Sequence, residues 1–419
     1  MRRLRLSWCV MECRSLKSRA ASRAEEPYKE TTMDMSVYTP AFATPDGGDA
    51  TGVVGALALG RLNGTRRRIA GALADSGQAA TAQALQDFSA GKGSAWRPET
   101  GLALQAHRNE SIPLAALQLA AACAGTGGRG YLDIRLEVPQ WLYLDGWLIP
   151  MKGLCSLSAD GRSINIHSDL DSTAFLASAE NRWIPAQDPT GPWTAYASGG
   201  LAPRYVAASG LRHSVEGFPW ITAAPPLDAV HRLAADPRIT AIHQGWRVIL
   251  EHASLYGSWV ACTASGCLLL DPNGNGAAQS GSSYDHPGLI AIEPPACPVF
   301  CGELLVHECS HQHLLVYTMV APVVKPDSDE TSYSPIKRAR RTMDRVLSGA
   351  HAIGNMIIYY ALLRRSMELD RASQQRFDQH RTWFAEDYRP ALDQSHNLTD
   401  AGRALWGSLC RAVDGALEN

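Results

Sequence analysis

The segment "FCGELLVHECSHQHLLVY" at residues 300–317 sets two histidines four positions apart within an apolar run. An α-helix places positions i and i+4 on one face, so His307 and His311 can bind one metal ion together. Glu308 lies one position round the helix and can reach the open side of that ion. His313 falls on roughly the opposite face, where we expect a packed or solvated side chain. The spacing therefore predicts a metal site on an amphipathic helix.

The residues before His307 predict where this helix begins, which element precedes it and which carboxylate could support a ligating histidine. Pro298 is expected to open the helix, because a missing N–H costs little in the first turn. The preceding run "GLIAIEPP" predicts an edge strand laid down directly before the metal helix. A ligating imidazole usually donates its second ring N–H to a carboxylate or carbonyl. Glu303, one turn before His307, is a candidate for that partner, although it could equally be a surface residue.

Two histidines leave a coordination sphere short of a ligand. The apolar stretch "RTMDRVLSGAHAIGNMIIYYALLRR" predicts a helix that must pack against the metal helix, and this would bring His351 near the histidine pair. Asn355, one turn later, could orient the ring. The alternative is that His351 is a buried, hydrogen-bonded core residue. Glu330 and Glu368 are further candidates for the third ligand.

Hydrophobic periodicity divides the chain into four parts. Residues 1–35 are rich in Arg and Ser, and we expect either a disordered segment or an extension ahead of a true start at Met33 or Met35. Apolar residues at spacings of three and four predict helices over 50–130, and alternation predicts strands and loops over 131–225. Helices return over 226–419, the predicted metal-binding catalytic domain. We therefore predict an α+β, mainly helical protein: a helical catalytic domain that bears the HExxH motif, with a smaller β-rich segment.

Composition narrows the classes of function. The net charge of −2 gives no electrostatic basis for binding a nucleic-acid backbone. We also expect no membrane partner, because no run of about 18 apolar residues is present. The ten cysteines are scattered and form no metal-binding or disulfide framework, which favours a reducing compartment and predicts a cytoplasmic protein.

Three blocks of sequence, in this order, resemble the HExxH-motif peptide-modification proteins. They are "SGSSYDHPGLIAIEPPACPVFCGELLVHECSHQHLL", "SYSPIKRARRTMDRVLSGAHAIGNM" and "HNLTDAGRALWGSL", and the resemblance covers roughly residues 225–415. The family's Tyr-x-Pro-x-Arg-x-x-x-Arg-Pro stretch begins here at Tyr333. Lys337 stands at its first arginine, Arg341 matches its second, and Thr342 replaces its last proline. A histidine of the third helix varies in position among relatives, and in one register Ser348 occupies that position.

The resemblance implies an enzyme that modifies ribosomally made precursor peptides. The family includes 2-oxoglutarate-dependent peptide β-hydroxylases, so Fe²⁺ and 2-oxoglutarate are the implied cofactors. In iron oxygenases of this kind three protein ligands leave positions open for the co-substrate and dioxygen. The distal carboxylate of 2-oxoglutarate needs a cation, for which Arg341 is the first candidate and Lys337 the second. The implied partner is the precursor peptide, alone or with a peptide-recognition protein.

Two other functions compete with this expectation. In a zincin-type peptidase Zn²⁺ would bind the histidines, and Glu308 would act as general base on a bound water. The chain lacks the extended HExxHxxGxxH pattern of one large group of such enzymes. A third possibility is a non-catalytic peptide-binding partner in a modification complex.

Overall fold

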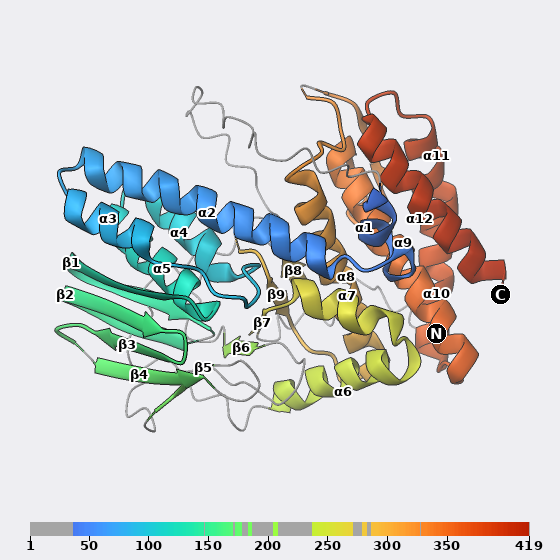
Figure 1. Ribbon diagram of the computed structural model, residues 1–419. Coiled ribbons are helices and arrows are strands. Elements are labelled where there is room, and N and C mark those ends of the chain that lie inside the picture. The colour runs from blue at the N-terminus through green and yellow to red at the C-terminus, as the bar shows by residue number, and fades with distance from the viewer. Residues whose placement is uncertain are drawn as a thin grey trace.

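The computed structural model describes residues 37–145, 147–170, 172–177, 183–186, 204–207, 237–270, 279–282, 286–326 and 328–418. The protein has a mixed α+β fold and is mainly helical, as the sequence predicts (Figure 1). The predicted N-terminal extension, residues 1–35, lies outside the described residues.

Four helices and an antiparallel sheet form one end of the molecule. Helix α2 (Thr51–Asp75) is followed by α3 (Ala79–Asp87), α4 (Pro98–Arg108) and α5 (Ile112–Gly125). At about 1.5 Å per residue, α2 is long enough to contact this group and also α8 (Pro298–Thr318). The sheet has strand order β1-β2-β3-β4-β5, with β1 (Arg129–Leu144), β2 (Trp147–Asp160), β3 (Ser163–His167), β4 (Ser172–Ala177) and β5 (Trp183–Pro185).

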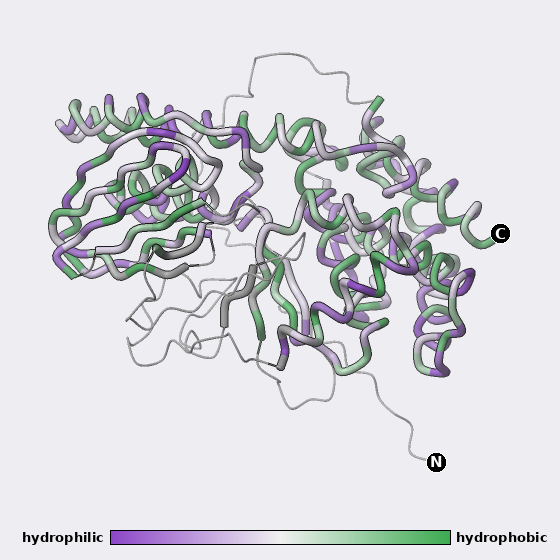
Figure 2. The backbone as a smooth tube through the Cα atoms, turned by 60° about the horizontal axis from the view of Figure 1, so that its bottom comes forward, coloured by the Kyte–Doolittle hydropathy of each residue, from purple (hydrophilic) through white to green (hydrophobic). Residues whose placement is uncertain are grey.

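Among the described residues, helices cover one face of this sheet. Helices α3 and α5 pack on β1, and Figure 1 shows the helical group stacked on that side. Along the first half of β1, buried residues alternate with exposed ones, as expected for a strand with one face toward solvent. Figure 2 accordingly shows hydrophilic and hydrophobic residues mixed along these strands.

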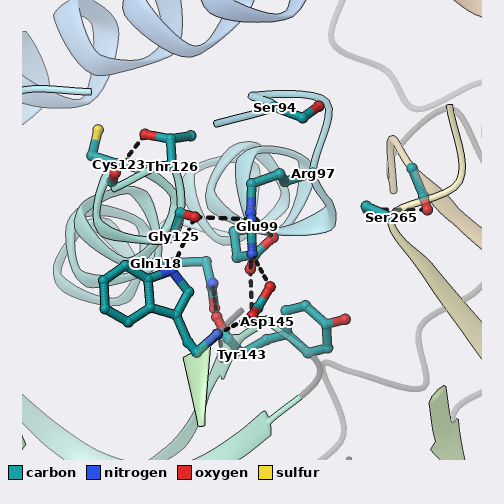
Figure 3. Close-up of polar contacts among 12 residues, drawn as sticks. Ser94, Arg97, Glu99, Gln118, Cys123, Gly125, Thr126, Tyr143, Asp145 and Ser265 are labelled. Carbon is teal, nitrogen blue, oxygen red and sulfur yellow. Dashed lines mark hydrogen bonds and ion pairs between the residues drawn. The ribbon is translucent and has the colours of Figure 1, made fainter. Parts of the chain in front are cut away.

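A buried ionic cluster ties the helices to the sheet (Figure 3). Arg97, next to the start of α4, binds Glu99 at 3.0 Å and Asp145 in the β1–β2 turn. Its guanidinium also donates to the Gly125 carbonyl at the end of α5. Every ionic group in this cluster has a partner, so it joins three elements and leaves no group to bind a ligand.

The strands of a second, four-stranded sheet precede α8 in the sequence. Its order is β6-β7-β9-β8, in which β6 (Arg204–Ala207), β7 (Gly266–Leu269) and β9 (Leu289–Ile292) are parallel and β8 (Ser280–Ser282) is antiparallel to β9. The predicted edge strand is β9, and that part of the prediction is wrong. Strand β9 pairs on both sides, all four of its residues are buried, and β8 forms the edge instead.

The predicted metal helix is α8 (Pro298–Thr318), which begins with Pro298 as expected. It is not amphipathic, because most of its residues are buried on every side. Its neighbours are α1 (Thr39–Ala43), α6 (Pro237–His252), α7 (Leu255–Thr263), α9 (Met343–Ser366) and the β8–β9 hairpin. A polar group on such a helix needs a partner or a ligand. The elements around and after it are α6 (Pro237–His252), α7 (Leu255–Thr263), β10 (Thr331–Ser334), β11 (Ala339–Thr342), α9 (Met343–Ser366), α10 (Arg371–Thr382), a π-helix (Trp383–Tyr388), α11 (Arg389–Asp393) and α12 (Asp400–Glu418).

Helix α9 is long and apolar enough, by length and composition alone, to cross a membrane. In this structure 83% of its most apolar window is buried inside the protein. It packs against α8, α10 and α12. We therefore regard α9 as the core helix of the C-terminal half.

The short helix α1 (Thr39–Ala43) inserts between helices that are distant in sequence. The last carbonyl groups of a helix have no partner inside it. Here the Ala41 carbonyl accepts a hydrogen bond from the Trp259 indole at 3.1 Å. The Ala43 carbonyl accepts from the His351 imidazole at 3.1 Å and the Asn355 amide at 3.0 Å. Buried side chains of the C-terminal half thus cap α1.

A candidate metal centre on α8

The structure brings His307, Glu308 and His311 together. Their ligand atoms all lie within 4.8 Å of one another. The Nε2 atoms of the two histidines are 3.1 Å apart, and the His307 Nε2 atom lies 3.7 Å from Glu308 Oε1. Two nitrogens bound at right angles to one ion, each about 2.1 Å from it, would be about 3 Å apart. The pair therefore has the separation that a shared ion requires.

Burial sets the charge state of this cluster. It lowers the pKa of His307 to about 4 and that of His311 well below its ordinary value, so both rings are neutral at pH 7. Neutral imidazole is the form that binds metals. Burial also raises the pKa of Glu308 to about 7. A cation at the site would oppose this effect and favour the carboxylate.

The carboxylate of Glu308 is buried and has no hydrogen-bond partner among the described residues. Ser280 and Ser282 of the edge strand β8 lie close enough to lower its pKa in part. Neither makes a full hydrogen bond, and both carboxylate oxygens lack a hydrogen-bond partner in the described part of the chain. A buried carboxylate in this state is costly unless something pairs with it. Two neutral imidazoles and this carboxylate form a donor set that fits a divalent first-row metal such as Fe²⁺ or Zn²⁺.

Helix α9 contributes a serine to this centre. The Ser348 hydroxyl lies 2.9 Å from His311 Nδ1. If this nitrogen carries the proton and donates to the hydroxyl, Nε2 is left with its lone pair toward the metal position. The serine that stands at the variable histidine position of the resemblance therefore contacts His311, one of the potential ligands.

We expect Ser348→Ala to weaken metal affinity about ten- to a hundredfold, the usual effect of removing a partner of a ligating histidine. Ser366→Ala is the matched control, because that serine lies at the far end of α9 and contacts His252. Titration of both variants with Fe²⁺ under anaerobic conditions measures the effect. Equal affinities in the two variants would contradict the role given to Ser348.

The structure does not place His351 with this cluster. Its Nε2 donates to the carbonyls of Phe42 and Ala43, at 3.0 and 3.1 Å, and thereby caps α1. Asn355 donates to the same Ala43 carbonyl and to the His351 carbonyl, so it shares the capping role. The buried core histidine weighed as the alternative is therefore the arrangement found, and Glu308 is the third potential ligand.

The two other candidates for a third ligand also lie elsewhere. Glu330 accepts hydrogen bonds from Ser395 at 2.9 Å and Asn397 at 2.6 Å, on the loop before α12. Glu368 is exposed just beyond the end of α9. His313 is packed as expected: its ring stacks on Trp259 with centroids 3.8 Å apart.

The two predicted co-substrate cations differ in their relation to the centre. Lys337 lies in the turn between β10 and β11, and its charge acts on all three members of the cluster, lowering their pKa values after the larger effect of burial. Arg341 pairs with Ser332 in the β10–β11 ladder, and its charge has no such effect. The structure therefore relates Lys337, the second candidate, more closely to the centre than Arg341.

Glu303 is a buried residue, and its partners lie on other helices. It accepts two hydrogen bonds from Arg376, at 2.7 and 2.6 Å, and one from His380 at 3.1 Å. Tyr360 of α9 donates to the same carboxylate. The sequence places Glu303 one turn before His307, and its charge partly offsets the effect of burial on the pKa of that histidine. Its direct contacts join α8 to α9 and α10.

The capping role of His351 predicts a pH dependence of stability. Burial lowers its pKa from 6.5 to about 4, against the raising effect of the two carbonyls. The unfolded chain then binds more protons between these values, so stability falls as pH falls from about 6.5 to about 4. His351→Gln keeps a donor for the carbonyls but does not titrate, and we expect a shallower slope in urea unfolding at pH 7, 6 and 5. His396→Gln, at an exposed position, is the control that should keep the wild-type slope.

Comparison with known proteins adds no family assignment. No family model matches the chain, and no curated protein matches it. The candidate centre is a cluster of two histidines and one carboxylate on a buried helix, with a serine on one histidine and a lysine whose charge lowers the pKa of all three groups.

Proposed function

We propose that the protein is an iron- and 2-oxoglutarate-dependent oxygenase that hydroxylates a ribosomally made peptide. The observation that carries this proposal is the donor set on α8, two histidines and one carboxylate. This is the composition of the facial triad of non-haem iron oxygenases, which leaves other positions on the metal open. The sequence blocks that resemble the peptide-modification proteins support the same class and suggest the peptide substrate.

Each residue has a separate role in this proposal. His307, His311 and Glu308 would hold the ion, and Ser348 keeps the His311 ring in the required tautomer. Iron, when bound, would supply the activation of dioxygen with 2-oxoglutarate as the co-substrate. Lys337 would pair with a carboxylate of 2-oxoglutarate. His307 and Glu308 are buried and His311 is partly buried, and burial strengthens the charge interactions within the cluster.

A zinc peptidase is the second candidate, and one observation favours it. The pKa of Glu308 is raised by burial to about 7, which suits a general base at neutral pH. This role would remove Glu308 from the ligand set. Within the residues that the structure describes, only His307 and His311 would then remain in the cluster, whereas catalytic zinc sites use three protein ligands. The donor count therefore favours the oxygenase.

The test measures consumption of 2-oxoglutarate by anaerobically purified, Fe²⁺-loaded protein after addition of air. We expect consumption with Fe²⁺ and none with Zn²⁺. We expect Lys337→Ala to raise the apparent 2-oxoglutarate requirement about ten- to a hundredfold, the effect of losing a charge-assisted contact of about 1.5–3 kcal/mol, while iron stays bound.

Arg341→Ala is the matched control from the same hairpin, and we expect a smaller effect from it. The opposite order of the two variants would assign the co-substrate to Arg341. Peptide cleavage by the Zn²⁺ form, without 2-oxoglutarate consumption by the Fe²⁺ form, would replace the oxygenase with the peptidase.

A further inference from the structure

One continuous segment, residues 331–349, supplies two groups to the metal centre. We call it the clasp segment; it comprises β10, β11 and the first two turns of α9. Lys337 is in the turn of its hairpin, and Ser348 is near its end. The hairpin has a fixed antiparallel register, in which Ser334 pairs with Ala339. Whatever holds this segment against the neighbouring helices therefore sets the positions of both groups.

A π-helix lies against the clasp segment. It covers Trp383–Tyr388, between α10 and α11, and contacts both β10 and α9. Single π-turns inside helices are uncommon, and they change the direction of a side chain relative to a regular helix. The last residue of this turn, Tyr388, is completely buried.

The phenol of Tyr388 meets the clasp segment at two places. Its hydroxyl lies 3.4 Å from the hydroxyl of Ser334, three residues before Lys337. It also passes over Gly349, directly after Ser348. A Cβ atom at Gly349 would be 2.7 Å from the Tyr388 hydroxyl oxygen and 3.2 Å from Cζ. The Tyr388 side chain therefore contacts Ser334, which directly precedes the turn that contains Lys337, and Gly349, which directly follows Ser348.

The glycine is informative because it lies inside a helix. Glycine in a helix interior is destabilising relative to alanine. At position 349 an alanine would collide with the phenol, and the nearest atom is the hydroxyl at the end of a rigid, buried ring. The space at Gly349 is thus needed for Tyr388 to reach Ser334.

We propose that Tyr388 is a positioning residue that holds the clasp segment, and with it Lys337 and Ser348, in register over the metal centre. The consequence of this inference for catalysis rests on the proposed function. Its geometry does not, because it depends only on the contacts of Tyr388 with Ser334 and Gly349. Within the described part of the chain, the Tyr388 hydroxyl is hydrogen-bonded to Ser334 and to none of the three potential metal ligands.

The test uses Gly349→Ala, Tyr388→Phe and the double variant, with Tyr333→Phe as the matched control. Tyr333 is on the same strand β10, but its side chain is exposed. Two properties are measured: the rate at which a soluble acetylating reagent modifies Lys337, followed by mass spectrometry, and the affinity for Fe²⁺ under anaerobic conditions. Circular dichroism shows that each variant is folded.

We expect Gly349→Ala to raise the labelling rate of Lys337 severalfold and to weaken Fe²⁺ binding about tenfold, through displacement of Ser348. Tyr388→Phe should raise the labelling rate about twofold, because the hydroxyl contact with Ser334 is lost. It should keep iron affinity, because the ring still packs over Gly349 and Ser348 is not displaced. The double variant should behave like Tyr388→Phe, because removing the hydroxyl removes the closest atom to the new methyl group. Such non-additivity is the mark of two residues in direct contact.

Unchanged labelling in Tyr388→Phe would overturn the inference, and so would a double variant as impaired as the sum of the single ones. If Gly349→Ala does not fold, Tyr388→Phe against Tyr333→Phe still decides. Neither measurement requires turnover. Wild-type protein that binds iron but consumes no 2-oxoglutarate would therefore remove the proposed function and leave the positioning role of Tyr388 standing.

Discussion

Replacing His307 or His311 with alanine is expected to abolish stoichiometric metal binding while the chain stays folded. Each change removes one of three potential ligands, and alanine is the best helix former, so α8 keeps its structure. Metal content measured after gel filtration, together with the far-ultraviolet spectrum, checks both parts. His313→Ala, on the same helix but stacked on Trp259, is the matched control and should retain metal. Stoichiometric metal in either ligand variant would exclude this centre.

The largest loss of stability is expected from Glu303→Gln. This change leaves the Arg376 guanidinium buried without a counter-charge, and removing one partner of a buried pair costs about 3–5 kcal/mol. The control is Glu251→Gln, in the exposed pair with Arg247, where the cost should stay within about 1 kcal/mol. Urea unfolding of both variants measures the difference, and similar midpoints would contradict the assignment.

The pH dependence of stability gives a second, independent test of the ion pair between Glu303 and Arg376. The charges of Arg376 and His380 outweigh burial and hold the pKa of Glu303 well below its ordinary value of 4.5. Its stabilising contribution is therefore present above about pH 4.5 and is lost as the pH falls further. The Glu303→Gln variant should lack this acid-dependent part of the unfolding free energy.

The local part of the metal centre could be predicted from the sequence. The relation of His307, Glu308 and His311 depends only on the geometry of five consecutive helical residues. The mainly helical α+β class followed in the same way from local periodicity. The edge strand was misassigned because pairing on the second side of β9 involves β8, and hydrophobicity along one strand does not reveal its neighbours.

Which residue of α9 faces α8 could not be predicted from local periodicity. Ser348 and His351 are three residues apart, so they differ by only about 60° around the helix. Which of them faces α8 depends on how α9 is rotated, and this is set by packing against α1, α8 and α12. The orientation found directs Ser348 to His311 and His351 to the end of α1. The capping role is indicated in the sequence by His351 and Asn355, which are one helical turn apart. Both side chains donate to the Ala43 carbonyl.

Helix α1 determines when this protein can finish folding. Its hydrogen-bond partners Trp259 and Asn355 follow it by 218 and 312 residues. During synthesis from the N-terminus, these donors do not exist until most of the chain has been made, and contacts so distant in sequence form slowly. A helix of five residues is not stable alone, so we expect the α1 segment to stay solvated in the nascent chain until these partners have been made. Closure of the helical core around α9 is thus a late event that follows translation of that helix.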